Sequence, residues 1–289
     1  MCKEKILVFG ANGQLGKSIK RVVDNKNKSE YDFIFLTKQQ SNITDKDVLD
    51  VVIKTHLPKY VINCAAYTNV DVAEDEKENA YAINVLGVKH LAQVCKSYNS
   101  CLIHISTDFV FEGSTLKFLD ENTICKPINY YGLTKLEGEQ EIQTILNTHF
   151  IIRTSWLYSE FGNNFVKTML RLGAEKESLQ VVNDQIGTPT YAIDLAKFII
   201  HIVEIKSEKF GVYHYSNNGL CSWYDFSKSI FEYTNNAIKV NPVASSVFKT
   251  KAIRPKFSVM SKQKVINNFD VEIDHWRTRL KECLEKITT

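Results

Sequence analysis

A glycine-punctuated stretch near the N-terminus constrains the fold of this chain most. A short apolar run, residues 6–9, comes first and is typical of a parallel strand buried on both faces. Three glycines follow at intervals of three residues: Gly10, Gly13 and Gly16. Apolar residues then recur at helical spacing, at Leu15, Ile19 and Val22. The pattern predicts a strand, a tight turn and a helix.

The same stretch has the chemistry of a phosphate site. Glycine lets a ligand approach the backbone closely, and a helix start offers free N–H groups and partial positive charge to a pyrophosphate. The common dinucleotide fingerprint is G-x-G-x-x-G, whereas this chain has G-x-x-G-x-x-G. Either form also occurs as an ordinary turn between a strand and a helix. The dinucleotide interpretation therefore needs support from other residues.

Strands and helices alternate through the N-terminal half. Further strands are predicted at residues 33–37, 60–64, 102–105 and 150–153. Helices are predicted at residues 45–55, with Thr44 as the cap, 73–97 and 131–146. This rhythm predicts an α/β fold with a Rossmann-type, doubly wound parallel sheet. Such sheets bind ligands at the carboxyl ends of their strands, where the winding reverses.

The alternation loosens after Trp156. Helices are predicted at residues 163–172, 194–203, 223–233 and 274–286, and extended segments at 179–182 and 212–215. We therefore expect a dinucleotide-binding domain at residues 1–156 and a smaller C-terminal α/β substrate-binding lobe at 157–289. Some of the later elements are expected to return to the sheet. No Pro/Gly-rich linker separates the halves, so we expect them to pack intimately.

Composition narrows the class of protein. The formal net charge is +3, from 36 basic and 33 acidic residues, which gives no reason to expect a nucleic-acid or membrane partner. The apolar runs are too short to cross a bilayer, and no signal peptide is visible, so a cytoplasmic location is expected. Seven cysteines without C-x-x-C spacing indicate scattered thiols rather than a disulfide framework or a zinc site.

Tyr131 and Lys135 carry the clearest chemical signal. A spacing of four places them on one helical face. A free tyrosine titrates near pH ~10, and a neighbouring ammonium lowers that pKa. The pair would then donate a proton to an oxygen that gains charge during hydride delivery. Thr107 follows a predicted strand, where its hydroxyl can hydrogen-bond the same oxygen. His104, inside that strand, is expected to be a hydrogen-bonded core residue rather than a metal ligand.

The glycine turn, the strand-end hydroxyl and the Tyr-x-x-x-Lys pair occur in an order that resembles the extended short-chain dehydrogenase/reductase family. Five further stretches are similar to motifs of its dTDP-4-dehydrorhamnose reductases: CAAYTNVD at 64–71, STDFVF at 106–111, RTSW at 153–156, NNFVKTM at 163–169 and NDQIGTPT at 183–190. The resemblance runs from about residue 5 to residue 255. It implies NAD(P)H-dependent reduction of the 4-keto group of dTDP-4-dehydro-6-deoxy-L-mannose to dTDP-L-rhamnose.

The resemblance also implies roles for individual residues. The catalytic roles fall on Thr107, Tyr131 and Lys135. The cofactor-binding positions are Gly10, Asn12, Gly13, Gln14, Leu15, Asn42, Ile43, Ala65, Ala66, Tyr67, Asn84, Tyr131 and Lys135. The substrate-binding positions are Thr68, Val70, Thr107, Asp108, Phe109, Tyr131, Trp156, Asn164 and Gln185. For Trp156, plain core packing stays open as an alternative to contact with the sugar.

Cofactor choice depends on the end of the second strand. An acidic residue there would bind the ribose 2′-hydroxyl and select NADH. This chain has Thr37 and Lys38 instead, and a lysine can pair with the 2′-phosphate of NADPH. We therefore expect NADPH, with NADH possible, and add Lys38 to the cofactor-binding residues. A solvated surface lysine is the alternative.

Phe109 separates this chain from neighbouring activities. Sugar-nucleotide 4,6-dehydratases carry Thr-Asp-Glu at these positions, and bifunctional epimerase-reductases carry a cysteine at the third. A phenylalanine supports neither acid–base step, so reduction alone is expected. One subgroup of the family dimerises through glutamates that hold Mg²⁺, but Ser18 occupies that helix position here. We therefore expect no metal and a monomer or weak homodimer.

Two other functions stay open. One is a reductase of another nucleotide-linked 4-keto-6-deoxy sugar, because the sequence fixes neither the base nor the stereochemistry at C4. The other is a non-catalytic, NADP-binding regulatory subunit that resembles the one of methionine adenosyltransferase and acts through protein contacts. The intact Thr107, Tyr131 and Lys135 favour an enzyme.

Overall fold

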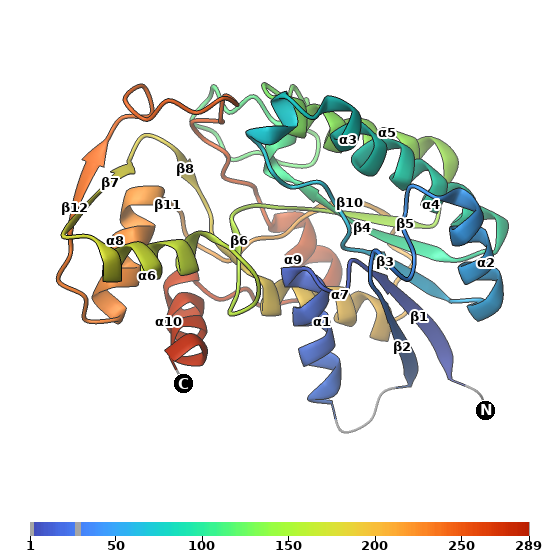
Figure 1. The fold of residues 1–289 in the computed structure, drawn as a ribbon. Coiled ribbons are helices and arrows are strands. Elements are labelled where there is room, and N and C mark those ends of the chain that lie inside the picture. The colour runs from blue at the N-terminus through green and yellow to red at the C-terminus, as the bar shows by residue number, and fades with distance from the viewer. Residues whose placement is uncertain (1–2, 27–29, 289) are drawn as a thin grey trace.

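A six-stranded parallel sheet forms the centre of the structure, a computed structural model that describes residues 3–26 and 30–288 (Figure 1). Within these residues the strands are, in order across the sheet, β10 (Gly211–His214), β5 (His149–Thr154), β4 (Cys101–Thr107), β3 (Tyr60–Asn63), β1 (Glu4–Phe9) and β2 (Tyr31–Leu36). Every neighbouring pair in this sheet runs parallel. The predicted fold class is therefore confirmed.

Helices cover both faces of the sheet, because successive side chains of a strand point to opposite faces. Ile6 and Val8 of β1 join the core on one face, while Leu7 and Phe9 join the core on the other. The first face is covered by α1 (Gln14–Asp24) and α7 (Ala192–Glu204). The second is covered by α2 (Lys46–His56), α4 (Gly87–Ser97) and α5 (Tyr130–Ile145).

The winding reverses at β1, which lies between β2 and β3. The carboxyl ends of β1 and β3 therefore flank the crevice where such sheets bind ligands. Gly10 directly follows β1 and has a φ of +76°, and a Cβ there would lie 2.7 Å from the Ala65 backbone nitrogen. Only glycine fits a turn this strained and this close to the neighbouring strand end.

The second half builds a smaller lobe, at the left of Figure 1. Its main elements are α6 (Phe165–Glu175), β7 (Ser178–Val182), α8 (Trp223–Tyr233), β12 (Lys239–Val243) and α10 (Trp276–Thr288). Short elements connect them: β6 (Leu157–Tyr158), β8 (Ile186–Gly187), β9 (Thr190–Tyr191), β11 (Cys221–Ser222) and α9 (Gln263–Phe269). As expected, two later elements return to the large sheet, since β10 pairs with β5 and α7 packs on α1. The division at residue 156 stays a prediction.

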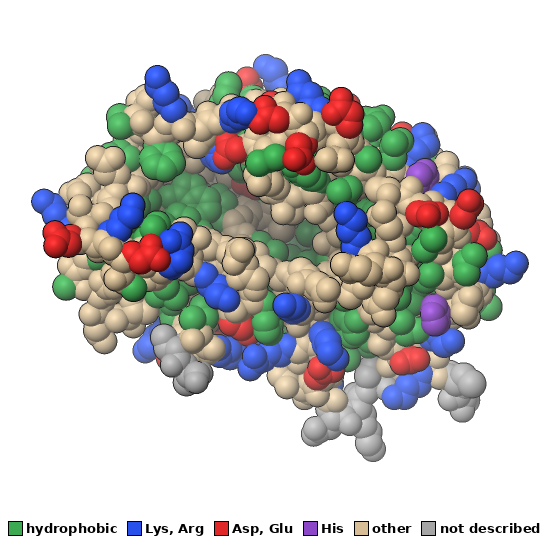
Figure 2. Space-filling model, viewed as in Figure 1, with side chains coloured by type: hydrophobic (Ala, Val, Ile, Leu, Met, Phe, Trp, Pro, Cys, Tyr) green, Lys and Arg blue, Asp and Glu red, His purple; other side chains and the backbone are tan. Residues whose placement is uncertain are grey.

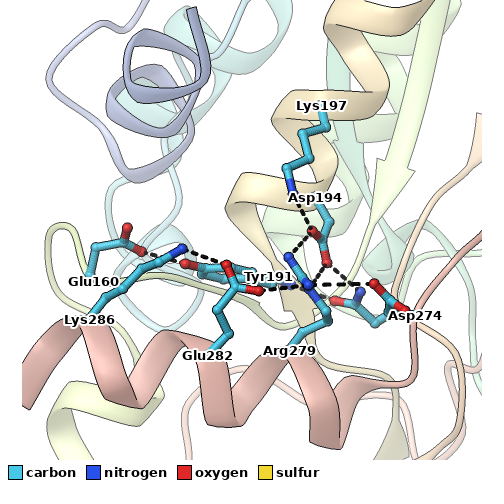
Figure 3. Close-up of polar contacts among 9 residues, drawn as sticks. Glu160, Tyr191, Asp194, Lys197, Asp274, Arg279, Glu282 and Lys286 are labelled. Carbon is cyan, nitrogen blue, oxygen red and sulfur yellow. Dashed lines mark hydrogen bonds and ion pairs between the residues drawn. The ribbon is translucent and has the colours of Figure 1, made fainter. Parts of the chain in front are cut away.

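A buried ion pair ties the C-terminal helix to the large sheet's helical layer (Figure 3). Arg279 of α10 donates two hydrogen bonds, of 2.8 and 2.7 Å, to the carboxylate of Asp194 on α7. Each residue is only 8% exposed. Asn217 donates to the same carboxylate at 2.9 Å, and Glu282 pairs with Arg279 at 2.7 Å. These contacts fix α10 against α7.

The structure corrects three local expectations. Asp45, not Thr44, caps α2 and accepts a hydrogen bond from the Val48 backbone N–H. The helix expected at 73–97 is interrupted, with a 3₁₀ turn (Val72–Glu74), α3 (Lys77–Tyr81) and a π-helical turn (Ala82–Leu86) before α4. The buried Asn84 side chain lies in the π-turn and binds the Tyr67 backbone, which competes with regular helix geometry. Segments β12 and α9 lie between residues 233 and 274, where the sequence analysis predicts neither a strand nor a helix.

Two expectations for the whole chain concern membrane crossing and the state of the cysteines. Within residues 3–26 and 30–288, no helix combines the length and apolar character that a membrane crossing requires. Six of the seven cysteines lie in this part of the chain and all six are free thiols, as predicted; Cys2 lies outside the described residues.

Candidate active site

A cavity of about 610 Å³ opens at the carboxyl edge of the sheet, between the sheet and the smaller lobe. Figure 2 shows this face hollowed, with apolar side chains in the depression. The glycine turn after β1, the end of β4, the start of α5 and the loop 154–164 all contribute to its wall. The topology therefore places the predicted site where the chain's chemical groups converge.

The three predicted catalytic residues line this cavity together. Thr107 ends β4, and Tyr131 and Lys135 lie one turn apart on α5. Asn129 caps α5 by accepting a 2.8 Å hydrogen bond from the Gly132 N–H. A Cβ at Gly132 would lie 2.2 Å from the Phe109 carbonyl oxygen, so glycine allows the helix to pack directly on the turn after β4. This contact brings the phenol beside the hydroxyl.

Burial dominates the electrostatics of the pair, which differs from the sequence-based expectation. The pKa of Tyr131 is raised to about 12 by burial, and a hydrogen bond with Thr107 lowers it less than burial raises it. Burial also lowers the pKa of Lys135 to about 8. The expected lowering of the tyrosine's pKa by the ammonium is therefore wrong for this geometry, because desolvation disfavours both charged forms.

Lys135 is held by two groups of β4. Its Nζ donates a 2.7 Å hydrogen bond to the Ile105 carbonyl oxygen and lies 3.1 Å from His104 Nε2. His104 is fully buried, and its Nδ1 lies 3.1 Å from the Asn63 side-chain nitrogen. The prediction of a hydrogen-bonded core histidine is confirmed. Its contact with Lys135 gave no signal in the sequence, because it depends on the register of β3, β4 and α5.

Most predicted substrate-binding residues also line the cavity: Thr68, Val70, Thr107, Asp108, Phe109, Tyr131, Trp156 and Asn164. The remaining one, Gln185, does not line it, although it is buried. The Phe109 ring meets the Tyr131 ring edge-on, with centroids 5.9 Å apart. Asp108 is buried beside Thr107, whose hydroxyl donates to its carboxylate at 3.1 Å, and burial raises the Asp108 pKa to about 6.

Trp156 lies at the far wall in a strained conformation, with a φ of +47°. Its ring stacks on that of Trp223, with centroids 3.5 Å apart and planes at 10°. Trp223 also lines the cavity and was missed from the sequence, since nothing in its local pattern distinguishes it from a core residue of α8. Trp156 therefore packs against Trp223 and also lines the cavity.

A second pocket, of about 330 Å³, continues from the glycine turn. Eight of the predicted cofactor residues line it: Gly10, Asn12, Gly13, Lys38, Asn42, Ile43, Ala65 and Ala66. Gln14, Leu15, Tyr131 and Lys135 line the larger cavity. Tyr67 and Asn84 line neither pocket. The Asn84 side chain forms two hydrogen bonds with the Tyr67 backbone, which shape the loop after β3.

The start of α1 fits a dinucleotide's diphosphate. Its N-terminus follows Gly13, and among the described residues no side chain caps it. Asn12 and Gly13, just before the helix, line both pockets, and Gln14 and Leu15 of its first turn line the larger one. A helix start of this kind offers free N–H groups to a phosphate. Gln14 joins this turn to the smaller lobe, because its side-chain oxygen accepts hydrogen bonds from Ser159 and Asn164.

The helix position occupied by Ser18 offers no metal ligand. Its hydroxyl donates to the Gln14 carbonyl oxygen at 2.8 Å, within α1. Among residues 3–26 and 30–288, no group of three or more His, Cys, Asp or Glu side chains is placed to hold a metal ion.

Comparison with known proteins agrees with this geometry. A family model described as the RmlD substrate binding domain matches residues 4–289. The chain is 40% identical to a dTDP-4-dehydrorhamnose reductase of Aggregatibacter actinomycetemcomitans, covering 96% of this chain and 97% of that protein. It is 34% identical to a dTDP-4-keto-6-deoxy-D-glucose reductase of Streptomyces niveus, covering 97% and 96%.

Among solved structures, a dTDP-4-dehydrorhamnose reductase from Bacillus anthracis in complex with NADP has a TM-score of 0.93 and 41% identity, covering 99% of this chain and 100% of that chain. The family model spans nearly the whole sequence, and both curated relatives exceed 30% identity over nearly full length. The chain therefore belongs to the RmlD family of NAD(P)H-dependent dTDP-4-dehydrorhamnose reductases, as its motifs predicted.

Proposed function

We propose that this chain reduces the 4-keto group of dTDP-4-dehydro-6-deoxy-L-mannose to dTDP-L-rhamnose, with NADPH as the reductant. The observation that carries the proposal is the convergence of Thr107, Tyr131 and Lys135 in one cavity, beside the glycine turn. Family membership supports the reaction, and the NADP bound by the Bacillus anthracis relative supports the cofactor.

The side chains of the cavity supply the proton and hold the reacting oxygen. NADPH supplies a hydride to C4 when it is bound. Tyr131 donates its proton to the C4 oxygen, since burial keeps the phenol protonated at neutral pH with a pKa of about 12. Thr107 hydrogen-bonds the same oxygen, and Lys135 holds the nicotinamide ribose.

The surroundings of Tyr131 support reduction without dehydration or epimerisation. Phe109 occupies the position at which related dehydratases and epimerase-reductases carry their acid–base residue. Its ring packs edge-on against the Tyr131 phenol. It has no proton to give and no lone pair to accept one. The thiols and carboxylates needed for C3 or C5 proton removal are therefore missing from this position.

Substitution of Tyr131 tests the proposal. Tyr131→Phe is expected to keep NADPH affinity and to lose about 10²–10⁴-fold in kcat, the usual contribution of general acid catalysis. Tyr130→Phe is the matched control, because the neighbouring phenol does not line the cavity. Turnover is followed by NADPH oxidation. Near-normal kcat in Tyr131→Phe rejects the assignment.

The substrate is tested with two sugars, because the Streptomyces niveus relative is named for the unepimerised one. NADPH oxidation is measured with dTDP-4-dehydro-6-deoxy-L-mannose and with dTDP-4-keto-6-deoxy-D-glucose, and the product configuration is read by NMR in deuterated water. We expect higher kcat/KM for the L-sugar, without exchange at C3 or C5. Preference for the D-sugar supports the alternative. NADPH binding without turnover of either sugar supports a regulatory subunit.

Lys38 supports the choice of NADPH, because it lines the second pocket together with Asn42. Lys38→Ala is expected to lower kcat/KM for NADPH about tenfold, the loss of one charge-assisted contact, and to leave NADH unaffected. Both cofactors are compared in wild type and variant. A wild-type preference for NADH contradicts the prediction.

A further inference from the structure

A chain of three buried side chains ends on Lys135. Asn63 of β3, His104 of β4 and Lys135 of α5 are 1%, 0% and 2% exposed. Asn63 Nδ2 lies 3.1 Å from His104 Nδ1, and His104 Nε2 lies 3.1 Å from Lys135 Nζ. Neither Asn63 nor His104 lines the cavity, so the roles proposed for the catalytic residues do not explain this series of hydrogen-bonded side chains.

The backbone fixes the direction of the first hydrogen bond. The Ala65 N–H donates to Asn63 Oδ1 at 3.0 Å, and a backbone N–H has no other role than donor. The Asn63 oxygen is therefore placed toward Ala65, and its NH₂ group faces His104. His104 Nδ1 must accept this bond. A neutral imidazole carries one proton, so that proton lies on Nε2. Burial holds the pKa of His104 well below its ordinary value, so the ring is neutral.

The Nε2–H group of His104 then points at Lys135 Nζ. An ammonium has only donors, so it would face this N–H with an N–H of its own. A neutral amine has a lone pair that accepts the bond, and it keeps an N–H for the Ile105 carbonyl. We propose that His104 is a positioning residue for Lys135: Ala65 and Asn63 fix its proton on Nε2, and this N–H donates to Nζ and favours the neutral amine.

Charged and titratable groups on the packed elements act on Lys135 as well. Glu139, one turn further along α5, favours the ammonium, but its carboxylate is paired with Arg153 of β5 at 2.6 Å. The Tyr131 phenol on α5, with a pKa of about 12, is uncharged at pH 7, and neither Tyr131 nor Asp108 is among the groups that shift the pKa of Lys135. The balance agrees with the geometry, since the pKa of Lys135 is lowered to about 8, mainly by burial.

The tautomer of His104 tests the inference directly. Two-bond ¹⁵N NMR of histidine-labelled protein distinguishes the protonated ring nitrogen from the unprotonated one, and His104→Gln assigns the signals. At pH 9, above the Lys135 midpoint of about pH 8, with and without NADP⁺, we expect the proton on Nε2 of His104. A proton on Nδ1 in the wild-type protein overturns the proposal.

The substitution Asn63→Asp is designed to reverse the direction of the hydrogen bonds that run from residue 63 through His104 to Lys135. A carboxylate accepts from both the Ala65 N–H and a His104 Nδ1–H, which leaves Nε2 free to accept from an ammonium. We expect the His104 proton to move from Nε2 to Nδ1. We also expect the Lys135 titration midpoint, followed by ¹³Cε-lysine NMR, to rise from about pH 8, with an increase in proton affinity of at least tenfold. His104→Gln is expected to raise the midpoint without adding charge, because its amide can present an oxygen to Nζ. Lys176, which is exposed, is the internal reference.

The two tests separate this inference from the proposed function. An unchanged tautomer in Asn63→Asp, or unchanged Lys135 midpoints in both variants, overturns the inference even if stability falls, because a purely structural role moves stability alone. Neither NMR measurement depends on the proposed reduction. If no sugar is reduced, the NMR measurements still decide whether His104 favours the amine.

Discussion

Asp108 shows how burial sets the chemistry of a single residue beside the candidate catalytic group. It is 2% exposed, and burial raises its pKa from 3.8 to about 6, although hydrogen bonds from Ser258 and Thr107 oppose the shift. The native state therefore keeps a proton between about pH 4 and 6 that the unfolded chain has lost. This group's contribution to stability is present at low pH and is lost as pH rises through that window.

Asp108→Asn removes the titration and keeps an oxygen for the Thr107 hydroxyl. Wild type is expected to lose about 2.5 kcal/mol more than the variant between pH 4 and 7, because the pKa of Asp108 is about 6 in the native state and 3.8 in the unfolded chain. Urea unfolding at several pH values measures the difference, with exposed Asp32→Asn as the control. Parallel stability profiles for wild type and Asp108→Asn contradict the raised pKa.

Sequence motifs pointed to residues that the fold brings into one cavity, but they did not give the electrostatic state of these residues. Thr107, Tyr131 and Lys135 were placed in one cavity by the order of strand end and helix, which the sequence shows. The direction of the Tyr131 pKa was wrong, because it depends on how deeply α5 packs against the turn after β4. Trp223 and Asn63 gave no signal, because their contacts with Trp156 and His104 cross long stretches of chain.

The helices and strands with a clear pattern of apolar residues could be predicted from the sequence. Each strand of the large sheet was anticipated, since short apolar runs buried on both faces are conspicuous in sequence. The interrupted helix before α4 was not, because Asn84 uses its side chain to bind the Tyr67 backbone. Strand β12 was missed as well; it carries Pro242, and it pairs with β7 from more than fifty residues earlier in the chain.

The ion pair between α7 and α10 is expected to contribute strongly to the free energy of unfolding. Arg279→Met leaves the buried Asp194 carboxylate without its guanidinium, so a loss of about 3–5 kcal/mol in unfolding free energy is expected. Arg171→Met, which breaks an exposed pair with Glu175, is the matched control and should cost under about 1 kcal/mol. Urea unfolding measures both variants.

A double variant separates the ion pair from simple loss of packing. Arg279→Met combined with Asp194→Leu removes both charges, and it should be more stable than Arg279→Met alone because no buried carboxylate is left unpaired. Equal stability of the single and double variants would mean that the arginine acts through its stem and not through its charge.

The whole molecule is arranged so that neither predicted half is complete alone. The first half supplies five strands of the large sheet, but β10 and α7 from the second half cover the β5 edge and the α1 face. One hydrophobic core contains Ile19 of α1, Phe150 of β5 and Trp276 of α10. Gln14 adds polar contacts from the glycine turn to the loop of the smaller lobe.

Because the core is shared, the two halves are expected to unfold in one cooperative step. Each of the three tryptophans belongs to the lobe or to its boundary: Trp156, Trp223 and Trp276. Tryptophan fluorescence therefore follows the smaller lobe, while far-UV circular dichroism follows the whole chain. In urea the two transitions should coincide, and saturating NADPH should move both midpoints upward together, because a ligand that binds only the native state stabilises the entire cooperative unit. A fluorescence transition at lower urea than the dichroism transition, with only one of them shifted by NADPH, would instead show two separately folding domains divided near residue 156.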